Sequence, residues 1–441
     1  MTDLSGWGRY PRVSGPLGHV ADMAAAAEAT SRMRGGVARG LGRSYGDAAI
    51  GRETTLAATG LDRMRSFDPV TGLLHVEAGV SLAEIIATFL PRGYFPPVVP
   101  GTRFVTVGGM IASDVHGKNQ HNDGTFGDHV EWLALARPDG TRLRCSPGEN
   151  PDLFRATIGG MGLTGVILEA AFRLKPVESG WIRQTTHVAR NLSEAIALLR
   201  KTGGATYTVA WIDVLARGAA LGRSLILEGE HAPADALSPR QDRFPAGGSG
   251  RLGVPIDMPG WLLNKRSVAA FNALYYRRGV RAARAPALVP WDAYFFPLDG
   301  ILNWNRIYGA RGFVQHQCVI PDAAAEAVLS DILDRLSARG EGSFLAVLKR
   351  LAPASGLMSF PMEGMTLALD LPVSEHRLSL LAEIDALVAG AGGRIYLAKD
   401  ACQSRETLHA GYPDIDRFRE IRRETGNATR MASKLSERLG L

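Results

Sequence analysis

The sequence has few cysteines and no long apolar run. Cys145, Cys318 and Cys402 stand far apart, without a CxxC pair or a disulfide framework, which suits a reducing compartment. No stretch approaches the roughly 18 apolar residues that cross a bilayer. The first ten residues lack the apolar core of a signal peptide. We therefore expect a cytoplasmic protein without a transmembrane segment, at most peripheral to the inner membrane.

Charge of one sign is not concentrated in blocks. The chain has 50 lysines and arginines against 44 acidic residues, which gives a formal net charge of +6. This excess suits an anionic ligand or an anionic membrane surface. Because no basic block is interleaved with aromatic residues, we expect no nucleic-acid partner.

Histidines close to aspartates raise the question of a metal site. His116, His121 and His129 each lie within a few residues of an aspartate. Their spacing matches no common ligand motif, so we predict no metal. His116 stands next to Gly117 among small residues, and it is the histidine that we expect to face a ligand.

Glycine, in contrast, is abundant. There are 51 glycines among 441 residues, a length that favours two domains. Within residues 39–47, three glycines and Ser44 expose successive backbone N–H groups. Such a nest can hold a pyrophosphate with help from an arginine, although a tight turn between strands is the alternative. The predicted phosphate-binding residues are Arg39, Gly40, Leu41, Gly42, Arg43 and Ser44.

A second glycine-rich segment covers residues 100–121. Its small residues let a flat ring system approach the backbone, and its hydroxyl and amide groups can bond the ring edges. Part of it, residues 111–115, also fits an ordinary buried strand or helix. The predicted ligand-lining residues are Pro100, Gly101, Thr102, Thr106, Gly108, Gly109, Ala112, Ser113, His116 and Gly117.

Residues 160–165 match the pattern GxGxxG of dinucleotide-binding proteins. That fingerprint requires a strand before it and a helix after it. Here a helix-like segment, 152–157, precedes it and a strand, 166–174, follows, so we reject the Rossmann fold. Three residues remain candidates for lining a cofactor, namely Gly162, Gly165 and Ile167.

The third part of the chain predicts an α+β fold. The order β-α-β-β-α-β is that of a split, ferredoxin-like unit, with helices on one face and the other face free to roof a ligand. Lys399 follows the last strand, where a lysine is usually a surface residue unless the strand reaches a ligand. The expected strands are 313–320, 344–351, 365–371 and 394–398, and the expected helices are 322–339 and 374–388.

Together these segments resemble the vanillyl-alcohol oxidase (PCMH-type) flavoproteins and, within that class, the decaprenylphosphoryl-ribose oxidase family. The similar phrases follow in order over nearly the whole chain. They begin at Gly6 (Gly-Trp-Gly), Arg39, Pro100, Val107, His116, Phe126, Gly162, Phe296, Trp304, Tyr308, Gly312, Gln315, Tyr396 and Tyr412.

The resemblance implies a two-domain flavoprotein. An FAD-binding domain would comprise residues 1–176, and a substrate-binding domain with an antiparallel sheet and helices would comprise residues 177–394. Residues 395–441 would return to the FAD domain. Residues 233–255, which are poor in large apolar side chains, are expected to form a mobile loop.

The resemblance also implies residue roles. Tyr396 would lie beside the cofactor, and Lys399 would be catalytic, by stabilising the reduced flavin or polarising the substrate oxygen. His116 is a second candidate, for the proton. The residues that would face the substrate are Gln315, Gln317, Lys349, Thr366, Ala368 and Lys399.

Two departures from the family pattern matter. Many relatives attach FAD through a histidine in the first glycine loop, where this chain has Arg43, so we expect non-covalent FAD. On the strand 365–371, Ala368 replaces a cysteine and Thr366 replaces an asparagine. These changes would prevent covalent inhibition at that position and alter substrate detail.

The expected reaction is oxidation of the 2'-hydroxyl of a polyprenylphosphoryl-ribose by hydride transfer to FAD, the first half of an epimerisation. An NAD(P)-dependent reductase would complete it, and the lipid-linked substrate implies peripheral membrane contact. The first alternative is an FAD-dependent alditol or aldonolactone oxidase acting on a soluble sugar. The second is a flavin-binding protein without turnover.

Overall fold

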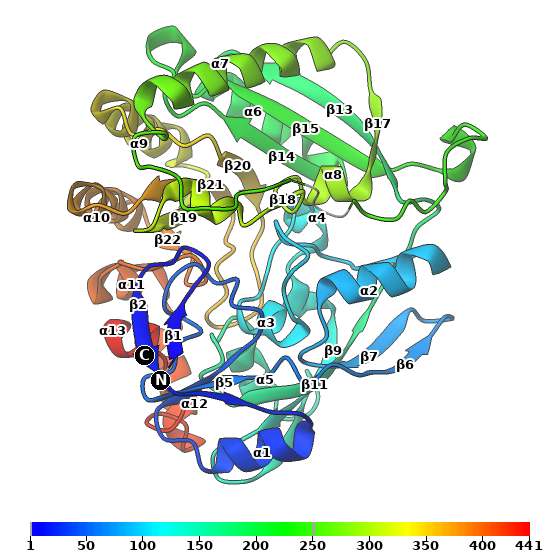
Figure 1. Ribbon diagram of the computed structural model, residues 1–441, viewed down its shortest axis with the longest axis vertical. Coiled ribbons are helices and arrows are strands. Elements are labelled where there is room, and N and C mark those ends of the chain that lie inside the picture. Colours follow the sequence, from blue (N-terminus) through cyan, green and yellow to red (C-terminus); the bar gives the residue numbers. More distant parts are fainter. Residues whose placement is uncertain (1, 249–251) are drawn as a thin grey trace.

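The computed structural model describes residues 2–248 and 252–441 of the chain. Figure 1 shows two stacked parts: a lower part that holds both termini, and an upper part built on one large sheet. Strands and helices are mixed in both, which confirms the α+β class. No helix within the described ranges has both the length and the apolar character needed to cross a bilayer.

Small sheets form the lower part. The largest has the order β10-β9-β11-β7-β6, and a parallel three-stranded sheet has the order β3-β5-β4. A hairpin turn at Asp139 and Gly140 joins the antiparallel strands β9 and β10, in keeping with the turn preference of these two residues. The strands are β1 Thr2–Ser5, β2 Arg12–Gly15, β3 Leu17–His19, β4 Gly36–Arg39, β5 Thr54–Ala57, β6 Met64–Asp68, β7 Leu73–Glu77, β8 Tyr94–Phe95, β9 Val130–Ala136, β10 Arg142–Cys145, β11 Val166–Arg173 and β12 Lys175–Pro176.

Short helices complete the lower part. Helix α2 begins after a capping box between Ser81 and Glu84, as their spacing indicates. Its buried face packs on the lower core with the strands of the five-stranded sheet. The helices are α1 Met23–Ser31, α2 Leu82–Phe89, α3 Val107–Ala112, α4 Gln120–Asp123, α5 Pro151–Thr157, α11 Arg405–Gly411, α12 Ile415–Glu424 and α13 Lys434–Leu439.

The upper part is one antiparallel sheet with the order β17-β13-β15-β14-β20-β21-β19-β22. Its second half contains the predicted β-α-β-β-α-β unit, with α9 and α10 packed against one face. The elements are β13 Trp181–Ala189, α6 Leu192–Lys201, β14 Tyr207–Ile212, β15 Ser224–His231, α7 Lys265–Ala282, β17 Ala287–Pro290, α8 Trp291–Phe295, β19 Phe313–Pro321, α9 Ala325–Arg339, β20 Ala346–Leu351, β21 Gly364–Pro372, α10 Glu375–Gly390 and β22 Arg394–Ile395.

The first half of this sheet repeats the same strand order. Numbered along the chain, each half has its strands in the spatial order fourth, first, third, second, and the halves join where β14 pairs with β20. Helix α6 lies on the same face as α9 and α10. Helix α7 instead crosses the opposite face, where Leu225 would meet a side chain added at Gly279. Sequence analysis missed this first unit because the long segment before α7 obscures its periodicity.

The predicted strand 394–398 is wrong in its second half. Strand β22 ends at Ile395, and a turn follows in which the N–H groups of Lys399 and Asp400 donate to the carbonyl of Tyr396 at 2.9 and 3.0 Å. The apolar run continues through Ala398 because these residues are buried, not because they extend the sheet. Lys399 therefore projects from a turn.

Residues after 400 pack on the lower part. The Gly36 N–H donates to the Arg430 carbonyl at 3.0 Å, and the Arg422 guanidinium, which is buried, donates to the Leu163 carbonyl at 3.2 Å. Arg438 pairs with Asp47 and Asp400, each at 2.9 Å. The end of the chain thus fixes the first glycine-rich loop.

The described residues of the segment 233–255 contain little regular structure. Strand β16 (Leu252–Gly253) pairs with β18 (Ile301–Leu302), and residues 249–251, within the predicted mobile loop, lie outside the described residues. Before them, Trp181 and Trp291 donate to the carbonyls of Asp242 and Pro245 at 2.8 and 3.0 Å. These bonds hold the segment against the large sheet. Its mobility stays a prediction.

Candidate active site

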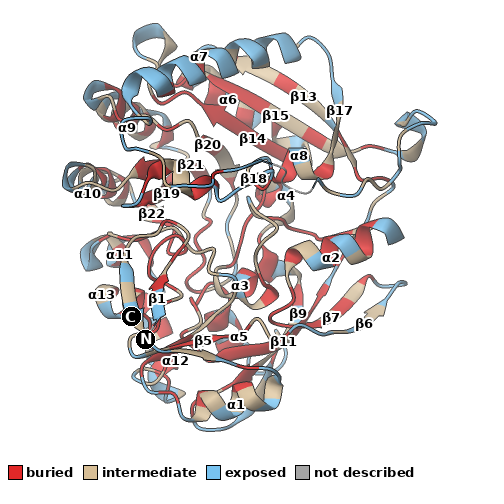
Figure 2. Ribbon diagram, viewed as in Figure 1, coloured by how far each residue is buried: buried red, intermediate tan, exposed pale blue. Residues whose placement is uncertain are grey.

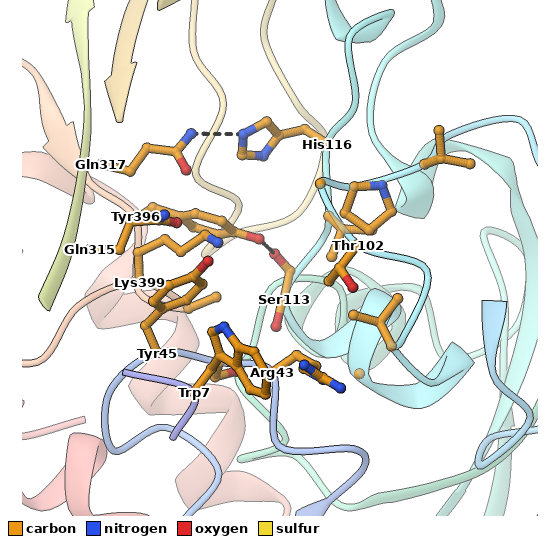
Figure 3. A pocket seen from close by; sticks show the side chains of 18 of the residues that line it. Trp7, Arg43, Tyr45, Thr102, Ser113, His116, Gln315, Gln317, Tyr396 and Lys399 are labelled. Atoms are coloured by element: carbon orange, nitrogen blue, oxygen red, sulfur yellow. Dashed lines mark hydrogen bonds between the residues drawn. The ribbon is translucent and has the colours of Figure 1, made fainter. Parts of the chain in front are cut away.

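A cavity of about 400 Å³ lies between the lower part and the open face of the large sheet. We call its glycine-rich side, residues 40–44 and 100–117, the floor. We call the sheet face that carries Gln315, Gln317, Lys349 and Ala368 the roof. Figure 3 shows side chains of both sides converging on this space, with Lys399 and Tyr396 between them.

Most of the predicted site residues line this one cavity. They are Gly40, Leu41, Gly42, Arg43, Ser44, Pro100, Gly101, Thr102, Thr106, Gly108, Gly109, Ala112, Ser113, His116, Gly117, Gly162, Gly165, Ile167, Gln315, Gln317, Lys349, Ala368, Tyr396 and Lys399. Arg39 and Thr366 are not among the lining residues. The Arg39 guanidinium donates to the carbonyls of Ser5 and Ala49, and the Thr366 hydroxyl accepts from Gln317 at 3.2 Å.

The first glycine loop has the shape of an anion nest. Within the described structure, the backbone N–H groups of residues 41–44 donate to no protein acceptor. Gly42 has a φ of 66°, in the left-handed region, and a Cβ there would come within 2.3 Å of the Arg39 guanidinium. Arg43 lies over the Trp7 ring at 3.9 Å, and its buried Nε has no partner. Unpaired N–H groups beside a guanidinium suit a pyrophosphate.

The second glycine segment forms a flat bed. Thr106 caps helix α3 by accepting from the Gly109 N–H at 3.2 Å, and this places Gly109 against the cavity. A Cβ on Gly109 would touch nothing but the Thr106 hydroxyl within 4 Å, and one on Gly101 would touch nothing. Both positions therefore leave room for a planar ring against the backbone. Nest and bed together fit a flavin dinucleotide.

Tyr396 and His116 stand side by side at one end of the floor (Figure 3). The Tyr396 hydroxyl donates to the Ser113 carbonyl at 2.8 Å, and its ring centroid is 5.1 Å from that of His116. Gln317 donates to His116 Nε2 at 2.9 Å, and His116 Nδ1 has no partner. Burial lowers the pKa of His116 well below its usual value, and Lys349 and Lys399 lower it further. The ring is therefore neutral, with its proton on Nδ1.

Three half-buried lysines line the same cavity. Burial lowers the pKa of Lys399 to about 7, with Asp370 raising it and Lys349 lowering it. Burial lowers the pKa of Lys349 to about 8 and, with the charge of Lys349, that of Lys118 to about 7. The Lys118 ammonium donates to the Tyr294 carbonyl and lies 4.1 Å from that ring. Cations placed this close together attract a multiply charged anion.

A buried carboxylate on the roof face of the sheet supports Gln315. Asp370 accepts from Gln315 Nε2 at 2.6 Å and from the Tyr308 hydroxyl at 3.2 Å, and burial raises its pKa to about 6. These bonds fix the amide of Gln315 at the cavity. Across from it, Lys399 Nζ lies 3.9 Å from the centroid of the Tyr45 ring. Gln315 and Lys399 are thereby held in fixed positions.

The cavity has an apolar end that the sequence analysis did not identify. Its walls come from β14, β15, α7 and α8, and Trp211 packs on Tyr275 with ring centroids 4.8 Å apart. Lys118 and Tyr45 were also missed, although both stand inside the glycine-rich phrases and could have been found there. The residues of the apolar walls stand in no comparable sequence motif. Lining residues at this end are Val209, Trp211, Leu227, Tyr275 and Phe295.

The GxGxxG segment follows α5 and precedes β11, as expected, so it is not a Rossmann loop. Gly162 and Gly165 nevertheless line the cavity, beside Ile167 of β11. Their left-handed φ values, 73° and 145°, belong to a turn that brings backbone next to the nest. The backbone of Gly162 and Gly165 therefore lines the cavity, although the segment is not a Rossmann loop.

Comparison with known proteins agrees with this geometry. Residues 17–146 match the family model described as FAD binding domain. Decaprenylphosphoryl-β-D-ribose oxidase of Mycolicibacterium smegmatis is 38% identical over 99% of this chain and 97% of its own length. An uncharacterised protein of Streptomyces coelicolor, from the mprA 5' region, is 37% identical over 82% of this chain and 99% of its own length. D-Arabinono-1,4-lactone oxidase of Yarrowia lipolytica is 30% identical over 29% of this chain and 24% of its own length.

The match to the mycobacterial oxidase is not confined to the glycine loops, because it spans 99% of this chain and therefore also covers the segments of the roof and the apolar walls. The family model identifies FAD as the cofactor, and the shape of nest and bed is compatible with it. With 38% identity over almost its entire length, this chain belongs to the decaprenylphosphoryl-β-D-ribose oxidase family of FAD-binding proteins.

Proposed function

We propose that this protein is an FAD-dependent oxidoreductase that converts the 2'-hydroxyl of a polyprenylphosphoryl-ribose to the 2'-ketone. The reaction is the first half of an epimerisation to the arabinose form. The observation that carries the proposal is the placement of Lys118, Lys349 and Lys399 next to an apolar wall that includes Trp211 and Tyr275. A lipid-linked sugar phosphate has the same sequence of groups: an anion between a polar sugar and an apolar chain.

The anion explains why three lysines share one cavity. Without a bound anion, burial and mutual repulsion lower their pKa values to about 7 or 8. A phosphate diester held by Lys118 and Lys349 would restore the charge of these two lysines through charge-assisted hydrogen bonds, whereas Lys399 would face the sugar hydroxyl. A neutral, soluble sugar would not offset that repulsion. Such a sugar also has no apolar group to contact the apolar end of the cavity.

Lys399 is the residue that we assign to the substrate hydroxyl. Bound FAD supplies the hydride acceptor. With a pKa of about 7, Lys399 Nζ is half deprotonated at neutral pH and can accept the hydroxyl proton as the carbon is oxidised. His116 is less suited to that role, because Gln317 occupies its Nε2 and the proton is on Nδ1. Gln315 and Gln317 orient the sugar.

Arg43 supports non-covalent binding of FAD. It lines the nest at the loop position where many relatives carry the histidine that bonds to the flavin. An arginine does not form such a covalent bond with the flavin. The Arg43 guanidinium stacks on the Trp7 ring and is thereby directed along the loop. We therefore infer that acid precipitation releases the flavin from the protein.

The wider setting follows from the chemistry. A ketone at C2' requires reduction to complete an epimerisation, so we infer an NAD(P)-dependent reductase as partner. We also infer a cytoplasmic enzyme whose FAD domain is residues 1–176, with residues 395–441 returning to it and residues 177–394 binding the substrate. The lipid chain of the substrate places the enzyme at the surface of the inner membrane.

Anaerobic mixing of the purified holoprotein with candidate substrates tests the proposal. A short-chain prenylphosphoryl-ribose is expected to bleach the flavin absorbance within seconds, whereas alditols and aldonolactones are not. Faster reduction by a soluble alditol or lactone would establish the alternative oxidase function. Flavin that no candidate bleaches would indicate a binding protein without turnover.

A further inference from the structure

Exposed apolar side chains are concentrated in one part of the chain. Among the described residues, eleven large hydrophobic side chains are exposed, and nine of them lie between Leu252 and Leu302. Trp261 is 74% exposed and Leu274 is 57% exposed. A soluble protein rarely leaves so many apolar groups together in water unless they have a partner.

The same region is strongly basic. Helix α7 carries five lysines and arginines and no acidic residue. None of these five side chains takes part in an ion pair formed by the described residues. Their charge is therefore available to a partner that is itself anionic. Figure 2 shows the outer side of α7 as almost continuously exposed.

The inner side of α7 is held firmly on the sheet. Asn272 is buried and donates to Asp213 at 2.8 Å, and the Tyr276 hydroxyl donates to the Ala189 carbonyl at 3.2 Å. Gly279 allows close contact with Leu225. The helix consequently presents a fixed outer face, which carries Phe271 and Leu274 together with the arginines.

An aromatic path connects this outer face with the cavity. Tyr275 is 39% exposed on α7 and also lines the cavity. Its ring centroid is 4.8 Å from Trp211 on the cavity side and 5.9 Å from Phe271 on the outer side. An apolar chain bound at the apolar end of the cavity would thus emerge beside the exposed face of α7.

We propose that α7 and residues 252–263 form a docking surface for a bilayer of anionic phospholipid. The arginines, Phe271 and Leu274 of the surface helix, together with Trp261 just before it, match the interfacial region of such a bilayer, where apolar groups enter and cations meet headgroups. The inference rests on the proposed function, and it specifies the face through which a lipid-linked substrate enters. It is independent of the residues assigned to catalysis.

Co-sedimentation of the FAD-loaded protein with vesicles tests this surface. Binding to vesicles of phosphatidylglycerol and phosphatidylcholine is expected, with much weaker binding to phosphatidylcholine alone. The emission of Trp261 should shift to the blue on binding, because its exposed ring would leave water. The double substitutions Trp261→Ser/Leu274→Ser and Arg278→Glu/Arg281→Glu should each lower the partition coefficient at least about tenfold.

Matched controls change equivalent exposed residues elsewhere. Val70, which is 91% exposed in the lower part, is replaced by serine, and the exposed Arg423 of α12 is replaced by glutamate. These controls should bind vesicles like the wild type. All variants should reduce their flavin with a soluble short-chain prenylphosphoryl-ribose at the wild-type rate, which shows that they are folded.

Two outcomes would overturn the inference. Undiminished vesicle binding by both α7 variants would place the membrane contact elsewhere or nowhere. Concentration-dependent dimers that the same substitutions abolish, without vesicle binding by the wild type, would identify a second copy as the occupant. The proposed function can fail separately, because vesicle binding requires no turnover.

Discussion

The floor and the roof of the cavity are made of different chemical groups. The floor presents backbone N–H groups and small residues such as Gly42 and Gly109, so its shape depends on the absence of side chains. The roof presents long amide and ammonium side chains, Gln315, Gln317 and Lys349, aimed from an antiparallel sheet. A cofactor that is always present can be held by shape, whereas a substrate that must enter and leave is selected by charge.

This contrast predicts which substitutions abolish cofactor binding and which affect substrate. Additions of side-chain atoms to the floor should exclude FAD. Removal of charge from the roof or from Lys399 should leave FAD in place and change turnover or substrate binding.

The largest effect is expected for Gly109→Leu. Its side chain would project into the bed, where a Cβ meets just the Thr106 hydroxyl, so FAD should be lost with all activity. We expect the fraction of protein that carries FAD, measured as flavin absorbance per protein, to fall below about one tenth of wild type. This fall corresponds to a loss of at least ~1.4 kcal/mol in the free energy of FAD binding. Gly148→Leu, at a loop glycine with open space around it, is the control and should stay yellow. A fully yellow Gly109→Leu protein would refute the bed.

Lys399→Met should have the next largest effect. The variant should retain FAD but reduce it at least about 100-fold more slowly, in line with the loss of one preorganised catalytic group. Stopped-flow reduction with saturating prenylphosphoryl-ribose measures this rate. Lys201→Met, an exposed lysine at the end of α6, should behave as wild type. A wild-type rate in Lys399→Met would remove this lysine from the mechanism.

Lys349→Met should mainly weaken substrate binding. The loss of one of the two cations that we assign to the phosphate is expected to raise KM about tenfold, which corresponds to ~1.4 kcal/mol, with kcat changed little. The effect should disappear for a neutral sugar substrate, if one is turned over. Lys434→Met provides the comparison on the surface. An equal fall in kcat and kcat/KM would instead assign Lys349 to the chemical step.

A dependence on pH of a few-fold should separate the two lysines. As pH rises through about 7, Lys399 loses its proton and becomes able to accept one, so kcat/KM should rise. As pH rises further through about 8, Lys349 loses its charge and phosphate binding weakens, so kcat/KM should fall. Lys349→Met should lose the alkaline limb and keep the acid limb. Unchanged limbs in that variant would contradict the assignment.

Sequence alone predicted the floor better than the roof. Gly101, Gly109 and Gly162 were predicted from glycine-rich motifs to line a ligand site, and all three line the cavity. Such motifs are informative because turns and close approaches of the backbone are local properties. The second half of the large sheet was predicted from hydrophobic period, apart from the turn at Lys399. The contact between Gln317 and His116 depends on the strand register of the large sheet. That register is set by pairing between distant segments and could not be derived from the sequence.

The apolar end of the cavity shows the same limit more clearly. Trp211 and Tyr275 are more than sixty positions apart and meet because α7 crosses the sheet on the opposite face from α6. No local pattern encodes which face a helix covers after a long connection. The prediction that Gln315 and Lys349 face the substrate came from the resemblance to the oxidase family and not from periodicity.

The ion pairs of Arg438 with Asp47 and Asp400 bear on how the protein is made. The nest loop emerges from the ribosome early, but the helix that fixes it is synthesised almost four hundred residues later. The nascent chain therefore carries an unfinished nest for most of its synthesis. We therefore expect tight capture of FAD only after synthesis of the chain is complete.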